Sequence, residues 1–286
     1  MPAIEHPLEE YTRHGMIPHI WCPGCGNGII LGEFARALGE LKYDKNKIVV
    51  VSGIGCIGRI SGYTNTDSFH TTHGRALAFA VGVKAARPDL KPVVISGDGD
   101  LFAIGGNHFI HAARRNVDIT VICSNNFNYG MTGGQSGPTT PIGAFTTTTR
   151  YGNIEHPFNL VHLAAASGAV YVARWTAIHV RHIRESMKKA ISKKGFSFIE
   201  IITPCPEGYG RRNKSADPIL DLKRLKQISE VRSFSDPTKA EVTPDKIIVG
   251  EFVDIEKPEF SDLLWEMNRL VQADLEKAGR RTNVAL

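Results

Sequence analysis

Two glycines flank Asp98 directly after the apolar run 92–96. Glycine lets the backbone turn sharply and leaves room for a bulky anion against the main chain. In an open parallel sheet, ligands bind at the carboxyl ends of the strands, which is where this turn would lie. A hard cation such as Mg²⁺ takes oxygen ligands from one or two side chains and from substrate phosphates and water. Asp98 is therefore a candidate magnesium ligand.

A polar loop follows the next apolar run, 119–123, and is succeeded by the glycine-rich stretch 130–135. The side-chain amide oxygen of Asn126 would reach the same sheet edge as Asp98, and the carbonyl of Asn128 would complete the protein's ligands. We expect these three groups to bind one Mg²⁺. For Gly-Asp-Gly taken alone, a plain turn between a strand and a helix is the alternative.

The chain has 5 cysteines, an odd number that disulfide bonds explain poorly in a reducing compartment. Cys123 lies inside an apolar run, where a free thiol behaves as a small hydrophobe. The other four stand beside glycine or proline in predicted loops. These candidate ligands are Cys22, Cys25, Cys56 and Cys205.

Four thiolates suit either a structural zinc ion or an iron–sulfur cluster, and their spacing alone does not decide between the two. A redox pair of Cys22 and Cys25 is a third alternative. The prolines on both sides of Cys205 argue against that pair acting alone.

Apolar runs alternate with helix-like segments through most of the chain, which predicts an α/β fold with a doubly wound parallel sheet. The predicted strands are 48–51, 92–96, 119–123, 169–173 and 196–201. The predicted helices between them are 28–41, 76–87, 101–116, 157–166 and 176–194. We interpret 139–153, rich in Thr, Gly and Pro, as a long surface loop of the kind that carries function.

From about residue 215 the strand–helix alternation stops, so we predict an α/β domain over 1–214 and a C-terminal extension over 215–286. The extension contains a predicted helix at 219–231, a short strand at 246–252 and a helix at 258–278. An apolar stripe on this last helix is expected to pack against the core or a partner. Its members are Phe260, Leu263, Leu264, Met267, Leu270 and Val271.

The 286 residues are 42% hydrophobic and 22% charged, typical of an ordinary globular protein. The net charge of +5 is spread along the chain, so nucleic-acid binding is not expected, although an acidic or anionic partner is. No apolar run approaches the roughly 20 residues of a membrane span, and the N-terminus has no signal-peptide core. We expect a cytoplasmic protein without membrane contact.

The motifs together resemble the β subunit of 2-oxoacid:ferredoxin oxidoreductases, which are thiamine diphosphate enzymes. They are, in chain order, Cys-Pro-Gly-Cys-Gly, Gly-Ile-Gly-Cys, His-Gly-Arg-Ala, Gly-Asp-Gly-Asp, Asn-Asn-x-x-Tyr-Gly-Met-Thr-Gly-Gly-Gln and Pro-Cys-Pro. The resemblance covers about residues 22–214. Residues 205–213 are most similar to the members that act on 2-oxoglutarate.

The resemblance implies a role for each motif residue. Cys22, Cys25, Cys56 and Cys205 would hold a [4Fe–4S] cluster, and Asp98, Asn126 and the Asn128 carbonyl would bind Mg²⁺. The diphosphate would be surrounded by Gly97, Gly99, Asp100, Gly130, Met131 and Thr132. His73, the candidate catalytic residue, would lie near the thiazolium ring with the backbone of Gly55 and Cys56.

The implied reaction is the oxidative decarboxylation of 2-oxoglutarate to succinyl-CoA and CO₂, with electrons passing through the cluster to ferredoxin, or its reverse. A partner α subunit would supply the glutamate that holds the cofactor's pyrimidine ring and much of the coenzyme A pocket. Candidates to bind the distal carboxylate of 2-oxoglutarate are Arg59, Arg75, Arg211 and Arg212. Alternatives are a pyruvate or branched-chain 2-oxoacid substrate, a non-redox thiamine lyase or transferase subunit with zinc, and a non-catalytic electron-transfer or scaffold subunit.

Overall fold

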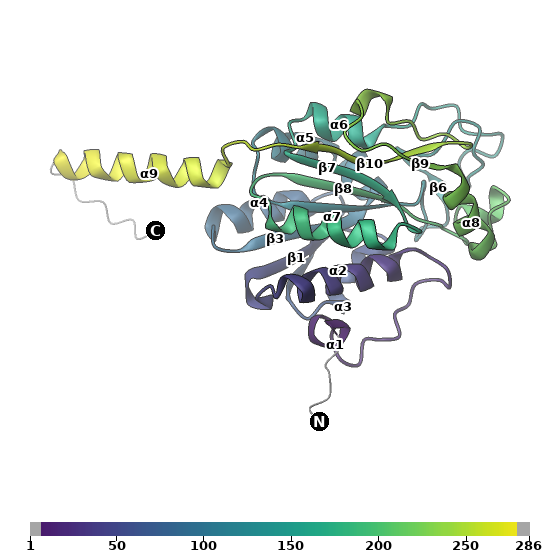
Figure 1. Ribbon diagram of the computed structural model, residues 1–286, viewed down its shortest axis with the longest axis horizontal. Coiled ribbons are helices and arrows are strands. Elements are labelled where there is room, and N and C mark those ends of the chain that lie inside the picture. The colour runs from purple at the N-terminus through teal and green to yellow at the C-terminus, as the bar shows by residue number, and fades with distance from the viewer. Residues whose placement is uncertain (1–6, 279–286) are drawn as a thin grey trace.

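A computed structural model describes residues 7–278, and within them the chain forms one central sheet with helices on both faces (Figure 1). The sheet is 8-stranded, in the order β2-β1-β3-β4-β8-β7-β10-β9. Its strands are β1 Ile48–Ser52, β2 Asp67–His70, β3 Lys91–Gly97, β4 Thr120–Asn125, β7 Tyr171–Thr176, β8 Ser197–Ile202, β9 Ser229–Val231 and β10 Ile247–Asp254. The strands from β2 to β7 in this order are all parallel. The predicted doubly wound parallel sheet is therefore confirmed.

The helices are α1 Pro7–Tyr11, α2 Asn27–Leu41, α3 Ile60–Tyr63, α4 Ala76–Ala86, α5 Gly106–Arg114, α6 Leu160–Ala166, α7 Val180–Ser192, α8 Pro218–Ile228 and α9 Phe260–Lys277. Most of them lie within predicted segments, but α1 and α3 were not predicted, and residues 229–231 of the predicted helix 219–231 form β9. The segment predicted as one helix over 101–116 is divided into a π-helical turn, Gly99–Ile104, followed by α5. Short 3₁₀ turns lie at Lys45–Lys47, Ile57–Arg59, Gly210–Arg212 and Pro237–Lys239, and a small hairpin joins β5 Asn128–Tyr129 to β6 Gln135–Ser136.

Two hydrophobic cores lie on the two faces of the sheet because successive strand residues point to opposite sides. In β1, Val50 joins the core under α2 and α7, whereas Val49 and Val51 join the core under α4, α5 and α6. Cys123 of β4 is fully buried in the second core, as predicted for a core thiol. Every residue of β1, β4, β7 and β8 is buried, which explains why these strands are mostly apolar in sequence.

The residues after 214 leave the strand–helix alternation, but they also complete the main sheet. β10 pairs antiparallel with β7, and β9 pairs with β10. The division of the chain at residue 214 stays a prediction, and residues 1–6 and 279–286 lie outside the described residues. No helix within 7–278 is long and apolar enough to cross a membrane.

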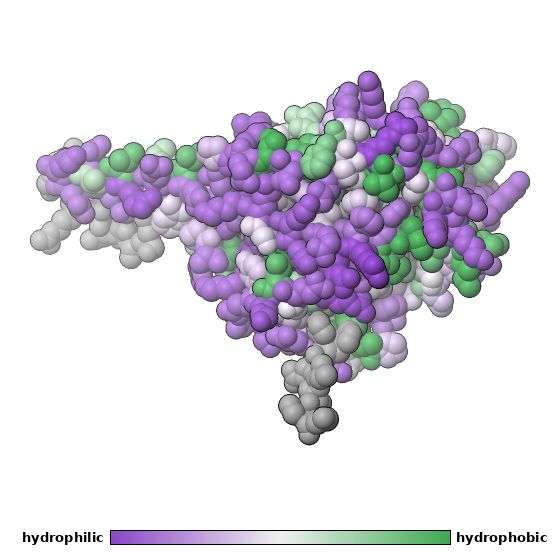
Figure 2. All heavy atoms as spheres, in the orientation of Figure 1, coloured by the Kyte–Doolittle hydropathy of each residue, from purple (hydrophilic) through white to green (hydrophobic). Residues whose placement is uncertain are grey.

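Helix α9 projects from the body of the molecule (Figure 1). Its predicted apolar stripe does not pack against the core, since Leu263, Met267, Leu270 and Val271 are all exposed. Phe260 at its start does contact the core, and the guanidinium of Arg115 lies 4.0 Å from the centre of its ring. The face shown in Figure 2 is mostly hydrophilic, with hydrophobic side chains gathered towards the end that carries α8, which exposes Ile219 and Leu220.

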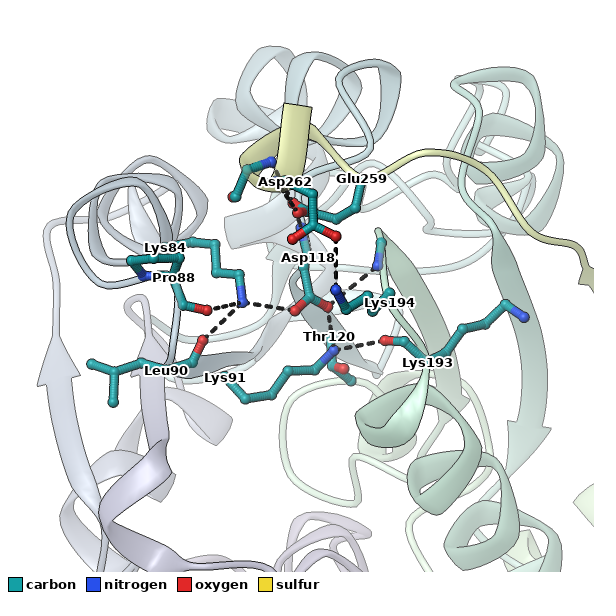
Figure 3. A network of polar contacts seen from close by, with 12 residues as sticks. Lys84, Pro88, Leu90, Lys91, Asp118, Thr120, Lys193, Lys194, Glu259 and Asp262 are labelled. Carbon is teal, nitrogen blue, oxygen red and sulfur yellow. Dashed lines mark hydrogen bonds and ion pairs between the residues drawn. The ribbon is translucent and has the colours of Figure 1, made fainter. Parts of the chain in front are cut away.

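A buried ionic network fixes the start of α9 to the amino edge of the sheet (Figure 3). Asp118, just before β4, lies between Lys84 at 2.8 Å and Lys91 at 2.5 Å. Burial raises the pKa of Asp118, but the two lysines outweigh it and lower the pKa overall. Glu259 accepts hydrogen bonds from the main-chain N–H groups of Asp118, Ser261 and Asp262, so it caps α9 and joins it to this network.

Candidate functional site

Four neighbouring parallel strands bring the predicted site residues to one edge of the sheet. Strand β3 ends before Asp98, and β4 ends at Asn125. Strand β1 leads into the loop that holds Cys56, and β8 leads to Cys205. Because parallel strands align their carboxyl ends, loops distant in sequence meet here.

A cavity of about 210 Å³ lies at this edge. Its lining contains every residue that was predicted to bind the cofactor: Gly55, Cys56, His73, Gly97, Asp98, Gly99, Asp100, Asn126, Asn128, Gly130, Met131 and Thr132. The lining also includes Ile54, Ile57, Ser124 and Tyr129, which were not predicted as site residues. Ile54 and Tyr129 lie within the quoted motifs, and Ile57 and Ser124 directly flank them, so their positions in the sequence were the available signal.

Asp98 is buried and lines this cavity, and the hydroxyl of Thr139 donates a hydrogen bond to its Oδ2. The N–H groups of Gly99 and Asn126 also donate to the carboxylate. Burial outweighs these bonds and raises the pKa of Asp98 to about 6. Within the described chain, no basic side chain forms an ion pair with Asp98. A buried carboxylate in this situation suits a bound cation.

Asp100 is equally buried, but its oxygens are occupied by the protein. Its Oδ1 lies 2.7 Å from His73 Nδ1 and accepts from the N–H groups of Gly74 and Ile54. Its Oδ2 accepts from the Ser96 hydroxyl. Asp100 therefore joins the loops after β1 and β2 to the turn after β3, and it orients the ring of His73 at the cavity.

Gly53 shows how closely these loops pack. A Cβ added at Gly53 would lie 1.9 Å from Asp100 Oδ2, so no other residue fits at this position without moving the carboxylate. The Asp100 carboxylate therefore requires a glycine at position 53, at the start of the motif that contains Cys56.

A tight turn places the two predicted asparagine ligands. Phe127 between them has a φ of 62°, and the side chain of Asn128 donates to the carbonyl of Asn126 over 2.7 Å. The Asn126 side-chain oxygen accepts weakly from the Asn128 N–H at 3.3 Å. Behind this turn, the Thr132 hydroxyl donates to the side chain of Gln135 over 2.7 Å. Both asparagines line the cavity beside Asp98.

The four predicted ligand cysteines are brought together, whereas Cys123 lies apart in the core. Burial raises the pKa of Cys25 to about 12, and the three other thiols, Cys205, Cys56 and Cys22, contribute to this shift. Burial likewise raises the pKa of Cys56 to about 11, with contributions from Cys205 and Cys22. Thiols that influence one another's pKa in this way lie in the same region of the molecule.

The loops that carry the thiols are held by contacts outside the motifs. The indole N–H of Trp21 donates to the carbonyl of Cys56 over 2.6 Å, which joins the Cys22–Cys25 turn to the Cys56 loop. A Cβ at Gly24 would lie 2.1 Å from Pro218, so the start of α8 packs directly on this turn. Cys205 Sγ lies 4.0 Å from Asn128 Oδ1, next to the cavity wall.

The loop predicted over 139–153 is only partly at the surface. Tyr151 is fully exposed and Ile154, just beyond it, is 88% exposed, but Thr139, Thr140 and Asn153 are buried. The buried part packs beneath the cavity, where Thr139 contacts Asp98. The prediction of a surface loop was therefore wrong for these buried residues.

Of the four arginines considered for the distal carboxylate, two have contacts near the cavity wall. Arg212 donates to the carbonyl of Gly208 over 2.9 Å, and a Cβ at Gly208 would lie 2.5 Å from Asn128 Oδ1. Arg75 donates to the carbonyls of Gly74 and Ile104. Arg211 and Arg212 are both exposed, and Arg211 pairs with Glu207 at 2.7 Å.

Comparison with known proteins agrees with this arrangement. The family model described as "Thiamine pyrophosphate enzyme, C-terminal TPP binding domain" matches residues 53–201. A solved structure of 2-oxoglutarate:ferredoxin oxidoreductase from Magnetococcus marinus, with 2-oxoglutarate, coenzyme A and succinyl-CoA bound, superposes with a TM-score of 0.83 and 32% identity. The superposition covers 99% of this chain and 94% of that one.

Two relatives are similar over nearly their whole length. The chain is 52% identical to the 2-oxoglutarate synthase subunit KorB of Methanocaldococcus jannaschii, over 93% of this chain and 98% of that protein. It is 49% identical to the KorB subunit of Methanothermobacter marburgensis, over 93% of this chain and 94% of that protein. With its thiamine pyrophosphate-binding domain and its similarity to these proteins along the chain, the protein belongs to the family of 2-oxoglutarate synthase KorB subunits.

Proposed function

We propose that this chain is the β subunit of a 2-oxoglutarate:ferredoxin oxidoreductase and that its cavity holds the diphosphate of thiamine diphosphate through Mg²⁺. The bound cofactor would accept the electrons that remain when a 2-oxoacid loses CO₂. Asp98, Asn126 and the carbonyl of Asn128 would hold the cation. The buried charge of Asp98, which lacks a basic partner in the described chain, supports this assignment.

The four thiols would hold a [4Fe–4S] cluster, which would pass electrons one at a time to ferredoxin. Around a single zinc ion, thiolates 2.3 Å from the metal would lie about 4 Å from one another. Within residues 7–278, no three His, Cys, Asp or Glu side chains are grouped closely enough to hold one metal ion. The redox partner named for the Magnetococcus marinus enzyme, ferredoxin, supports a redox cluster over zinc. Thiolate ligands also require a reducing compartment, which supports a cytoplasmic location.

The position of Cys56 is the observation that carries the proposal. It lines the cavity that contains Asp98, and its pKa is raised in part by Cys205 and Cys22. The proposed cofactor site and the proposed cluster site therefore share a residue. Electrons generated at the cofactor would have a short path to the cluster.

The site is open to solvent at its rim, where Ile54 and Met131 are 42% and 45% exposed. We infer that a partner α subunit covers this rim and supplies the glutamate for the pyrimidine ring together with much of the coenzyme A and 2-oxoglutarate pocket. The name "subunit" of the relatives and the ligands bound in the Magnetococcus marinus structure support this inference. The isolated chain should then be inactive.

An anaerobic visible spectrum of the chain purified with its partner tests the function. We expect brown absorbance that bleaches when 2-oxoglutarate is added, with turnover on addition of coenzyme A. Pyruvate and a branched-chain 2-oxoacid should leave the spectrum unchanged. A colourless protein that contains zinc would contradict the redox function, and bleaching by pyruvate alone would contradict the substrate.

A further inference from the structure

A line of buried polar side chains runs from Asp98 into the interior. The hydroxyl of Thr139 contacts Asp98 Oδ2 on one side and lies 2.9 Å from Asn125 Oδ1 on the other. The Asn125 amide in turn donates to Glu200 Oε1 over 2.8 Å. All four side chains are at most 3% exposed. The proposed function assigns no role to the side chains of Thr139, Asn125 or Glu200.

The orientation of the Asn125 side chain follows from its neighbours. Its oxygen accepts from the N–H of Phe127 at 3.1 Å, and its nitrogen faces the carboxylate of Glu200, which can only accept. The Asn125 oxygen therefore points at Thr139. A threonine hydroxyl has one proton, so it can donate to only one of the two acceptors that it faces. The carboxylate of Asp98 is the stronger acceptor, because hydrogen bonds to an ionised group are the stronger ones.

The far end of the line is anchored by a buried ion pair. Glu200 Oε2 lies 2.6 Å from Arg174 Nε, and both side chains are buried. The Arg174 guanidinium also donates to the carbonyl of Ala240 over 2.8 Å and to the side chain of Asn159 over 3.0 Å. Glu200, and with it Asn125, is therefore held in one position. Thr139 rests against a rigid support rather than against solvent.

We propose that Thr139 is a positioning residue for the cation site. It holds one carboxylate oxygen of Asp98, with Asn125, Glu200 and Arg174 as its support, so that the other oxygen is presented to the cation in the cavity. This rests on the proposed function, because it requires Asp98 to be a magnesium ligand. Residues behind a metal ligand commonly change metal affinity by about 10-fold to 100-fold when they are altered.

Two substitutions of Thr139 separate positioning from packing. Thr139→Val keeps the methyl group and the volume but removes the hydroxyl, whereas Thr139→Ser keeps the hydroxyl and removes the methyl group. The measurement is a calorimetric titration of Mg²⁺ into the complex of both subunits. The complex is first freed of Mg²⁺, and thiamine diphosphate is present throughout. We expect Thr139→Val to weaken Mg²⁺ binding by about 10-fold and Thr139→Ser to bind within about 2-fold of the wild type.

If Thr139 only filled space, the order of the two Mg²⁺ affinities would be reversed. Thr139→Ser would then bind Mg²⁺ more weakly than Thr139→Val, because it loses the buried methyl group. That order, or wild-type Mg²⁺ affinity in Thr139→Val, would overturn the proposal. If Thr139→Val does not assemble with the partner subunit, Thr139→Ala replaces it and is compared with Thr139→Ser, which is one hydroxyl larger.

Asp98→Asn in the same titration separates this proposal from the proposed function. Loss of Mg²⁺ binding in Asp98→Asn with unchanged binding in Thr139→Val would leave the magnesium site in place and refute only the role of Thr139. Wild-type affinity in Asp98→Asn would refute the site itself and the positioning role with it.

Discussion

Asp100 shows that a residue in a cofactor motif can act through its neighbours. One oxygen accepts from two main-chain N–H groups and contacts His73, so the side chain holds three loops around the cavity. Asp98, two positions earlier, also accepts hydrogen bonds from Thr139 and Asn126, but within residues 7–278 neither a histidine nor a basic side chain pairs with it. The two aspartates of Gly-Asp-Gly-Asp are thus chemically alike but differ in what surrounds them.

Replacing Asp100 by asparagine should therefore lower both stability and activity. The amide cannot accept all of these hydrogen bonds, and the donors left unpaired should cost about 2 kcal/mol in the free energy of unfolding. Reduction of ferredoxin should fall at least about 10-fold, because a His73 displaced by about 1 Å would no longer be aligned with the reacting atoms. Urea unfolding and anaerobic ferredoxin reduction measure the two effects. Ser96→Ala, which removes one bond to Asp100, is the matched control; equal behaviour of both variants would refute this role.

Arg212 and Arg211 should differ in their effect on substrate choice. Both arginines are exposed, but Arg212 contacts Gly208, which packs against Asn128, whereas Arg211 pairs with Glu207. We expect Arg212→Ala to reduce the preference for 2-oxoglutarate over pyruvate by about 10-fold to 100-fold, the range for a lost charged hydrogen bond. Arg211→Ala should leave kcat/KM for both substrates unchanged. If the double variant keeps its preference, neither arginine binds the distal carboxylate.

At the scale of elements, helix α7 begins with a half-buried histidine. Burial, together with neighbouring His182, lowers the pKa of His179, which precedes the first turn of the helix. A positive charge at this end would also oppose the helix dipole. The folded chain therefore binds fewer protons here than the unfolded chain, so stability falls as the pH drops below the usual histidine pKa of about 6.5.

The substitution His179→Gln should remove part of this acid sensitivity. The melting temperature of the wild type should fall between about pH 7 and pH 5, and that of His179→Gln should fall less over the same range. Differential scanning calorimetry in a pH series measures the change. His162→Gln, on the exposed side of α6, serves as the control. Parallel curves for the wild type and His179→Gln would show that His179 does not contribute.

Most of the sheet could be predicted because its central strands are buried on both faces and read as apolar runs. The edge strand β2 could not, since Asp67–His70 is mostly exposed and has no apolar pattern. The short strand at 246–252 was expected, but its partner was not, because antiparallel pairing with β7 joins segments more than 70 positions apart. Local sequence indicates a strand but not its place in the sheet.

Most of the residues that line the cavity could also be predicted from the sequence. Motif residues come directly after the strands, and the topology alone brings Cys56, Asp98 and Asn126 together. Thr139 was missed because it lies in a threonine-rich segment that looks exposed, and its contact with Asp98 spans 41 positions. Its burial depends on the packing of the whole loop against the sheet, which no local pattern reports.

At the scale of the whole molecule, the cavity and the projecting helix lie at opposite ends of the sheet. The cavity is at the carboxyl ends of the parallel strands, while α9 is fixed to Asp118 at their amino ends. Because β10 runs antiparallel to β7, it carries the chain from one end to the other. A partner that binds α9 would therefore lie at the end of the sheet opposite to the cavity.

Two truncations should distinguish these parts. A chain that ends at residue 214 lacks β10 and the carbonyl groups of Ala240 and Ile248, so buried Arg174 would lose acceptors at a cost of about 3 kcal/mol. We expect that chain not to unfold cooperatively in urea. A chain that ends at residue 262 keeps Glu259 and its contacts, and its free energy of unfolding should stay within about 2 kcal/mol of the full chain. Cooperative unfolding of residues 1–214 would support a domain boundary there.

Arg174 also has a consequence for the chain as it leaves the ribosome. The guanidinium and Glu200 are synthesised before Ala240 and Ile248, whose carbonyl groups it needs in the finished interior. Until those residues emerge from the ribosome, the guanidinium of Arg174 lacks two of its acceptors, and burying an incompletely paired charge is unfavourable. We therefore expect the β7 side of the sheet to stay in contact with water until then. The support behind Thr139 is therefore among the last parts to form, and the nascent chain should acquire its metal-binding capacity late in translation rather than when the motif around Asp98 has been made.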